Sequence, residues 1–97
     1  MRVEFDGEII YWRGPSPFYF VEVPDDESAE IHAVAAQVTY GWGVIPATVE
    51  LGATRWTTSL FPRGDLYMVP LKAHVRGAEK LDLGDAVHVA LELEVGY

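Results

Sequence analysis

Residues 87–95, VHVALELEV, carry the clearest structural signal in this chain. Valine or leucine stands at every odd-numbered position, whereas His88, Glu92 and Glu94 stand at even-numbered positions. Successive side chains of a β-strand point to opposite faces, so this alternation is typical of a strand with one buried and one wet face. The stretch therefore predicts a sheet with an apolar side, which other strands of the chain must share.

Five further segments have strand character. They are residues 3–9, which can extend to 12, and residues 18–23, 44–51, 54–61 and 66–69. Glycine and proline separate them, because proline fixes φ and glycine adopts conformations closed to other residues. Residues 44–51 and 54–61 are predicted to form a hairpin, in which Pro46 indicates an edge or a bulge. A turn is predicted at residues 62–65.

Two short helices are predicted between these strands. Residues 25–38 begin with three acidic residues, which suit the positive end of a helix dipole, and continue with apolar residues at helical spacing. A second helix is predicted to open at Pro70 and to end at Gly77. About six short strands with few helices favour a barrel or a sandwich, so the fold class is mainly β.

Composition limits the classes of function. The 97 residues, 10.8 kDa in mass, are enough for a single domain spanning 1–97, and the formal net charge is −8. Nucleic acid is not an expected partner, because phosphate-backbone binding depends on cationic side chains. The chain has no cysteine, which excludes a disulfide framework, a thiolate nucleophile and a cysteine–zinc site.

No targeting or membrane-spanning segment is expected. Arg2, Glu4 and Asp6 stand where a secretory signal needs an apolar run. Residues 38–49 are uncharged, but they contain two glycines and Pro46 and are far fewer than the roughly 20 residues of a transmembrane helix. We expect a soluble, cytoplasmic protein that does not bind a membrane.

The common catalytic and cofactor motifs are missing from the sequence. Gly41-Trp42-Gly43 begins a dinucleotide fingerprint, but Pro46 occupies its third glycine position. The sequence has no Walker loop and no serine nucleophile elbow, and its three histidines are not spaced as ligands on one element. We therefore expect no cofactor, no metal and no catalytic residue.

Charge is distributed unevenly along the chain. The segment 55–80 contains five basic and two acidic residues, whereas the rest of the chain is strongly acidic. Such a basic island indicates a binding site for an anion or for an acidic surface. Within it, Lys72 and Arg76 are four residues apart and would share one face of a helix.

Aromatic and hydroxyl side chains accompany this island. Tryptophan and tyrosine combine flat apolar area with a polar tip, which suits small-ligand pockets, although aromatic residues also fill small β cores. Hydroxyls in the strand around Trp56 would need partners if they faced a barrel interior. The predicted ligand-binding residues are Trp42, Trp56, Ser59, Tyr67, Lys72 and Arg76.

The order of features along the chain resembles a bacterial family. The runs WTTSLFP at 56–62, LYMVPLK at 66–72 and LGDAVHV at 83–89 carry most of the resemblance, and FVEVP at 20–24 fits the opening. Over positions 3–95 the chain is similar to the domain of unknown function 1905 family. The resemblance implies a small, partly open antiparallel β-barrel and no established activity.

The resemblance also limits what can be carried over. Relatives often carry a further C-terminal segment linked with the bacteriocin-protection (YdeI/OmpD-associated) proteins, and the sequence to Tyr97 contains no such segment. Any role of that segment is therefore not transferred. Of the predicted site residues, all except Trp42 stand at positions that match the family.

The favoured function is a non-catalytic binding module for a small anionic ligand or an acidic partner segment. Lys72 and Arg76 would contact the charge, and Trp56 and Tyr67 would form apolar walls. This interpretation needs the cations and the indoles to lie together.

Two alternatives remain open at this stage. Residues 68–87 are also similar to AbrB-type transcription factors, although the net charge of −8 opposes DNA binding. An enzyme would need a positioned acid–base pair, for which His74 or His88 near Asp85 is a candidate without support. A homodimer through strand edges or aromatic faces is compatible with each of these functions.

Overall fold

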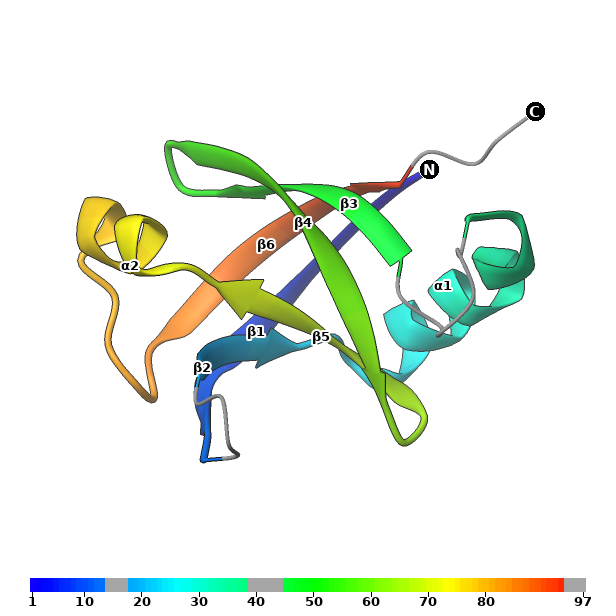
Figure 1. Ribbon diagram of the computed structural model, residues 1–97, viewed down its shortest axis with the longest axis horizontal. Helices are drawn as coiled ribbons and strands as arrows, with labels where there is room; N and C mark the ends of the chain where they lie inside the picture. Colours follow the sequence, from blue (N-terminus) through cyan, green and yellow to red (C-terminus); the bar gives the residue numbers. More distant parts are fainter. Residues whose placement is uncertain (14–17, 39–44, 94–97) are drawn as a thin grey trace.

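Six antiparallel strands close into a barrel in the computed structural model, which describes residues 1–13, 18–38 and 45–93 (Figure 1). The elements are β1 (Arg2–Trp12), β2 (Phe18–Glu22), α1 (Asp25–Val38), β3 (Ile45–Leu51), β4 (Thr54–Arg63), β5 (Leu66–Leu71), α2 (Ala73–Glu79) and β6 (Ala86–Leu93). Around the barrel the order is β1-β2-β5-β4-β3-β6. The predicted mainly β class, a small antiparallel barrel of six strands with two helices, is confirmed.

The barrel is closed, whereas the resemblance implied a partly open one. Two long strands close it because each pairs with two neighbours in succession. Residues 2–8 of β1 pair with β6 and residues 9–12 pair with β2. Residues 54–60 of β4 pair with β3 and residues 61–63 pair with β5. Strands that pass from one sheet to another in this way make the corners of a small barrel and leave no free sheet edge among the strands described.

Gly7 lies at the corner of β1. A Cβ atom there would lie 2.6 Å from Val21 Cγ1, so only glycine lets the two strands approach this closely. Just beyond it, the Ile9 N–H donates to the Asp85 carbonyl (3.0 Å) and the Ile9 carbonyl accepts the Gly84 N–H (2.9 Å). These bonds hold the loop before β6 against the corner.

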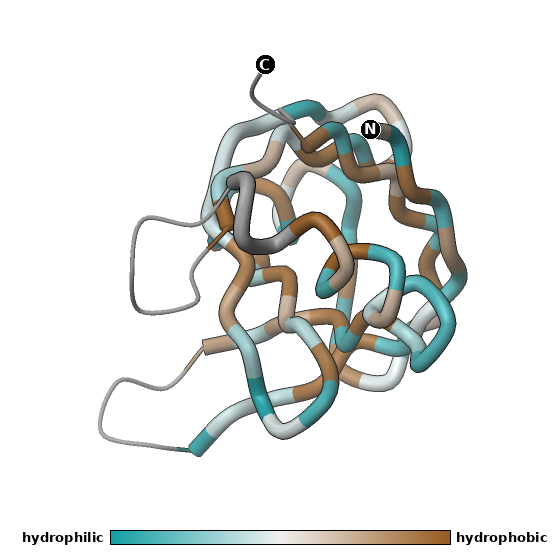
Figure 2. The backbone as a smooth tube through the Cα atoms, turned by 90° about the vertical axis from the view of Figure 1, so that its right-hand side faces the viewer, coloured by the Kyte–Doolittle hydropathy of each residue, from teal (hydrophilic) through white to brown (hydrophobic). Residues whose placement is uncertain are grey.

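The predicted alternation is present in the strands and determines which side chains form the core. Figure 2 shows hydrophobic and hydrophilic residues alternating along the strands. In β6 the odd-numbered residues 87–93 are buried, while His88 and Glu92 are exposed. Glu94 and Val95, the last residues of the predicted strand, lie outside the described residues.

The two helices lie at opposite ends of the barrel (Figure 1). The predicted helix is present as α1 and buries Ile31 in the core. Ser28 of α1 is fully buried; its Oγ donates to the Val23 carbonyl (2.9 Å) and accepts the Tyr67 N–H (3.2 Å). A buried hydroxyl with both roles filled ties the start of α1 to β5. In the described ranges, no helix is long and apolar enough to cross a membrane.

Three predicted boundaries were wrong. The β4 strand continues through Pro62 to Arg63, leaving a two-residue turn in which Gly64 has a φ of +60°. The β5 strand includes Pro70, and α2 begins only at Ala73. Proline fits in β5 because the strand pairs with β4 only through residues 66–68, so the missing N–H of Pro70 costs no bond of that ladder.

The α2 helix also runs past Gly77, its predicted end. Lys80 takes the left-handed position instead, with a φ of 54°. The Lys80 N–H donates to the Gly77 carbonyl (3.4 Å) and the Leu81 N–H donates to the Arg76 carbonyl (2.9 Å). This is a Schellman motif, and Leu81 packs against the core as the motif commonly requires.

A second apolar layer lies on the outer face of the barrel. Phe20 and Met68 are buried, yet they alternate with the inward-facing residues of β2 and β5 and are not part of the central core. Arg63 helps to cover Phe20, because its guanidinium carbon lies 4.8 Å from the ring centroid of Trp12 and 5.8 Å from that of Phe20. We call this layer, with the exposed Phe61 beside it, the aromatic face.

Candidate functional site

A cleft of about 490 Å³ opens at the α2 end of the barrel. The end of β1, the start of β2 and the junction of β5 with α2 form it. Its lining residues are Tyr11, Phe18, Tyr19, Pro70, Leu71, Lys72, Ala73 and Arg76. The volume is within the range of small-molecule sites, which are apolar clefts with a few placed polar groups.

The strand register forms the aromatic wall of the cleft. Tyr11 is paired directly with Tyr19, and their rings meet edge to face with centroids 4.9 Å apart. Tyr19 packs against the core, while Tyr11 is 37 % exposed. The wall thus has a fixed base and an accessible rim, on which the ring of a ligand can lie.

The short connection from β5 to α2 brings the two cations to this wall. Lys72 is the residue before α2, and its carbonyl accepts the N–H groups of Val75 (3.0 Å) and Arg76 (3.1 Å). Arg76 therefore stands one helical turn beyond Lys72. Both side chains line the cleft, although Lys72 has extended backbone and lies before α2, so the two do not share a helix face as predicted.

Arg76 is held by the protein but has no counter-charge. Its guanidinium carbon lies 3.9 Å from the ring centroid of Tyr19, a cation–π contact. Its Nε is buried without a hydrogen-bond partner. In the described part of the chain, neither Arg76 nor Lys72 forms an ion pair with a carboxylate. Of the seven Lys and Arg residues, only Arg2 and Arg55 form ion pairs within the described part of the chain, so Lys72 and Arg76 are distinguished by lining one cleft together.

The other predicted site residues lie elsewhere. Trp56 and Tyr67 are 7 % and 5 % exposed and belong to the central core, where burial raises the pKa of Tyr67 and leaves the Trp56 indole N–H without a partner. Ser59 lies opposite Pro46 in the strand pair, next to the inward-facing Leu60, and so faces outward. Trp42 lies outside the described residues. Of the predicted residues that the structure describes, only Lys72 and Arg76 line the cleft.

Sequence reasoning missed the three aromatic residues of the cleft. Tyr11, Phe18 and Tyr19 flank the predicted turn at 14–17, and a hairpin register centred on that segment would place Tyr11 opposite Tyr19, as the structure has it. That register is the sequence signal for the aromatic wall, and it does not depend on the basic island.

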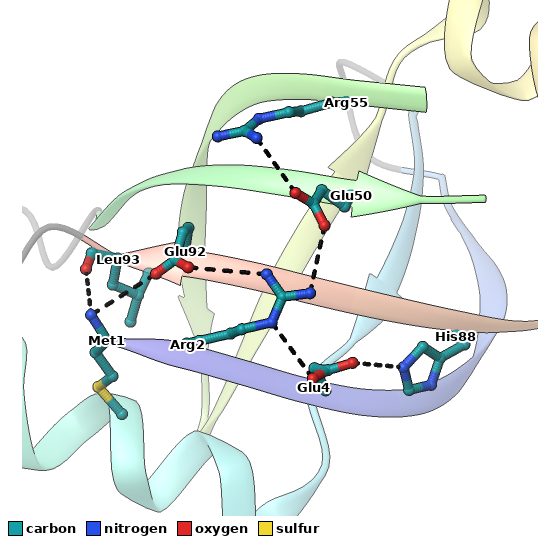
Figure 3. A network of polar contacts seen from close by, with 8 residues as sticks. All are labelled: Met1, Arg2, Glu4, Glu50, Arg55, His88, Glu92 and Leu93. Carbon is teal, nitrogen blue, oxygen red and sulfur yellow. Dashed lines mark hydrogen bonds and ion pairs between the residues drawn. The ribbon is translucent and has the colours of Figure 1, made fainter. Parts of the chain in front are cut away.

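The basic island is not one surface. Arg55 pairs with Glu50 (3.4 Å), and Arg63 lies over the aromatic face. Arg2, outside the island, is the centre of a network with Glu4, Glu50 and Glu92 on the outer face of β1, β3 and β6 (Figure 3). Arg2 and Arg55 are therefore balanced by acidic neighbours, in contrast to the cations of the cleft.

His88 extends the same network and makes it dependent on pH. Its Nδ1 lies 2.8 Å from Asp6 Oδ1 and its Nε2 lies 3.1 Å from Glu4 Oε1. Both nitrogens can donate only in the imidazolium form. The hydrogen bond with Glu4, and then that with Asp6, raises the pKa of His88, and the same bond with His88 lowers the pKa of Glu4.

These pKa shifts predict the pH range in which the network stabilises the fold. Because the pKa of His88 is higher in the folded state, its contribution to stability is fully present below about pH 6.5. That contribution is lost as the pH rises through the folded-state pKa. The lowered pKa of Glu4 makes its contribution present above about pH 4.3 and lost on acidification through its folded pKa. His88→Gln should therefore lower the urea midpoint at about pH 5.5 and leave it unchanged at about pH 8.5. The exposed His32→Gln is the control, and a pH-independent His88 effect would contradict the assignment.

The observations define a class of protein: a small closed antiparallel β-barrel with an aromatic and cationic cleft at one end. The chain belongs to the family described as Domain of unknown function (DUF1905), whose model matches residues 5–91. A search of curated proteins found no match. The resemblance noted in the sequence is thus confirmed over nearly the whole chain.

Proposed function

We propose that this protein is a non-catalytic binding module that holds a small anionic ligand in the cleft between the β1–β2 wall and α2. The observation that carries the proposal is the pair of cations, Lys72 and Arg76, that line one cleft without a carboxylate partner among the described residues. The buried Arg76 Nε also lacks an acceptor among the described residues, so the protein leaves the guanidinium incompletely hydrogen-bonded.

The shape of the cleft favours a small molecule over an acidic partner segment. The lining residues come from two strand ends and one short junction and enclose about 490 Å³. An extended acidic peptide would place most of its carboxylates beyond Lys72 and Arg76, on a chain whose net charge is −8. Affinity must therefore come from local contacts, because the long-range field repels anions.

The test removes the two cations together. Lys72→Ala/Arg76→Ala should weaken binding of a small organic anion by at least about tenfold, because a hydrogen bond to a charged group contributes about 1.5–3 kcal/mol. Binding is measured by ¹⁵N–¹H NMR titration with acetate, succinate, phenylacetate and phenyl phosphate, and with a tetraglutamate peptide for the acidic segment. Shifts should concentrate at residues 18–19 and 70–76.

A matched variant controls for loss of charge. Arg55→Ala/Lys80→Asn removes two positive charges outside the cleft, and asparagine tolerates the left-handed backbone of position 80. This control should bind as the unmodified protein does. The proposal fails if no anion of the panel binds, or if both double variants lose binding equally.

A further inference from the structure

We infer that the ligand of this cleft is a planar aromatic monocarboxylate without an ammonium group. The inference rests on the proposed function and narrows it to a chemical class. Three features of the lining lead to it: the aromatic wall, the geometry of Arg76, and the lack of any acidic side chain among the lining residues.

The apolar lining needs a ligand with an apolar body. Tyr11, Tyr19 and Leu71 are directly paired across β1, β2 and β5 and so lie in one row, and Phe18, Pro70 and Ala73 also line the cleft. An inorganic anion or a short dicarboxylate would fill only the charged end and leave this surface in water. A flat ring covers the aromatic wall and gains the offset or edge-to-face contacts that aromatic pairs prefer.

The contact between Arg76 and Tyr19 favours a carboxylate as the charged group. The guanidinium carbon lies over the Tyr19 ring, 3.9 Å from its centroid, so this contact fixes the guanidinium beside the aromatic wall. The N–H donors lie in the guanidinium plane, and a planar carboxylate matches two of them at once. Lys72 adds a point charge that suits either carboxylate oxygen.

The charge of the lining excludes zwitterions. Among the described residues that line the cleft, two are cationic and none is Asp or Glu. A free aromatic amino acid would therefore bring its ammonium group next to two cations with no carboxylate to receive it. A neutral aromatic molecule would leave both cations unpaired. A ring with one carboxylate and no amine satisfies the whole lining.

A matched ligand series tests the class on the intact chain. Phenylacetate should bind in the cleft by NMR titration. Cyclohexylacetate, which keeps the charge but has no aromatic ring, should bind about three- to tenfold more weakly. The neutral 2-phenylacetamide and the zwitterion phenylalanine should each bind at least about tenfold more weakly. Phenyl phosphate distinguishes a carboxylate preference from a general preference for aryl anions.

The Tyr19 variants test the positioning of Arg76. Tyr19→Leu should abolish the preference for phenylacetate over cyclohexylacetate and shift the Arg76 Nε–H resonance. Tyr19→Phe, which keeps the aromatic ring, should leave the preference and the resonance as they are in the unmodified protein. Equal binding of cyclohexylacetate, or tighter binding of phenylalanine or phenyl phosphate, would overturn the inference and leave the proposed function intact. Absence of binding by every anion would instead overturn the proposed function.

Discussion

Phe20→Ala should lower the free energy of unfolding by about 3–5 kcal/mol, the usual cost of removing a buried phenylalanine ring. Phe20 is 0 % exposed although it points away from the central core, because Phe18, Trp12 and Arg63 lie around it. A domain of this size is stable by only about 5–15 kcal/mol, so the variant should be close to unfolding at physiological temperature. Urea denaturation monitored by circular dichroism measures the loss.

Phe61→Ala is the matched control on the same aromatic face. Phe61 is 41 % exposed and lies opposite Met68 in the strand pair. Its removal should cost less than about 1 kcal/mol, as is usual for partly exposed positions. Similar losses for the two variants would mean that Phe20 is not the centre of a second apolar layer.

Gly52→Ala should cost about 1.5–3.5 kcal/mol, from a backbone cost and from a lost hydrogen bond. Gly52 has a φ of +60°, where a residue with a Cβ atom pays about 1–2 kcal/mol. In addition, the new Cβ would overlap the Glu79 carboxylate. Glu79 accepts a hydrogen bond from Thr54 Oγ1 (2.6 Å), which ties the end of α2 to the β3–β4 hairpin. Displacing that carboxylate breaks the tie.

Gly64→Ala separates these causes. Gly64 has the same φ of +60°, but a Cβ atom there would meet nothing within 4 Å. This variant should lose only the backbone cost, and the excess loss in Gly52→Ala then measures the Glu79 contact. In a double-mutant cycle, that excess should vanish when Thr54 is already alanine. An equal loss at both glycines would contradict a role for Glu79.

The tie between Glu79 and Thr54 also bears on the cleft. It holds the C-terminal end of α2, while the bonds from Val75 and Arg76 to the Lys72 carbonyl hold the first turn. Both ends of α2 are therefore fixed by hydrogen bonds, and together they hold Arg76 in position. Loosening α2 by Gly52→Ala should weaken anion binding without altering any residue that lines the cleft.

Much of the fold was present in the sequence because alternation is a local property. Residues 87–93 and the hairpin around Gly52 needed no knowledge of the rest of the chain. The predicted ends of β4 and β5 were wrong because proline does not end either strand: β4 continues through Pro62 and β5 continues through Pro70. Each proline is tolerated where its strand has an unpaired side or ends a ladder, and local sequence does not show which side is paired.

The sequence by itself determined the strands and their inward faces, since these follow from a period of two residues. Only the tertiary structure decided what stands opposite Lys72 and Arg76. Barrel closure sent Trp56 and Tyr67 into the core and brought Tyr11 and Tyr19, more than fifty residues away in sequence, to the cleft. Side-chain periodicity is set by the backbone of one strand, whereas the partners across a barrel end depend on register and closure.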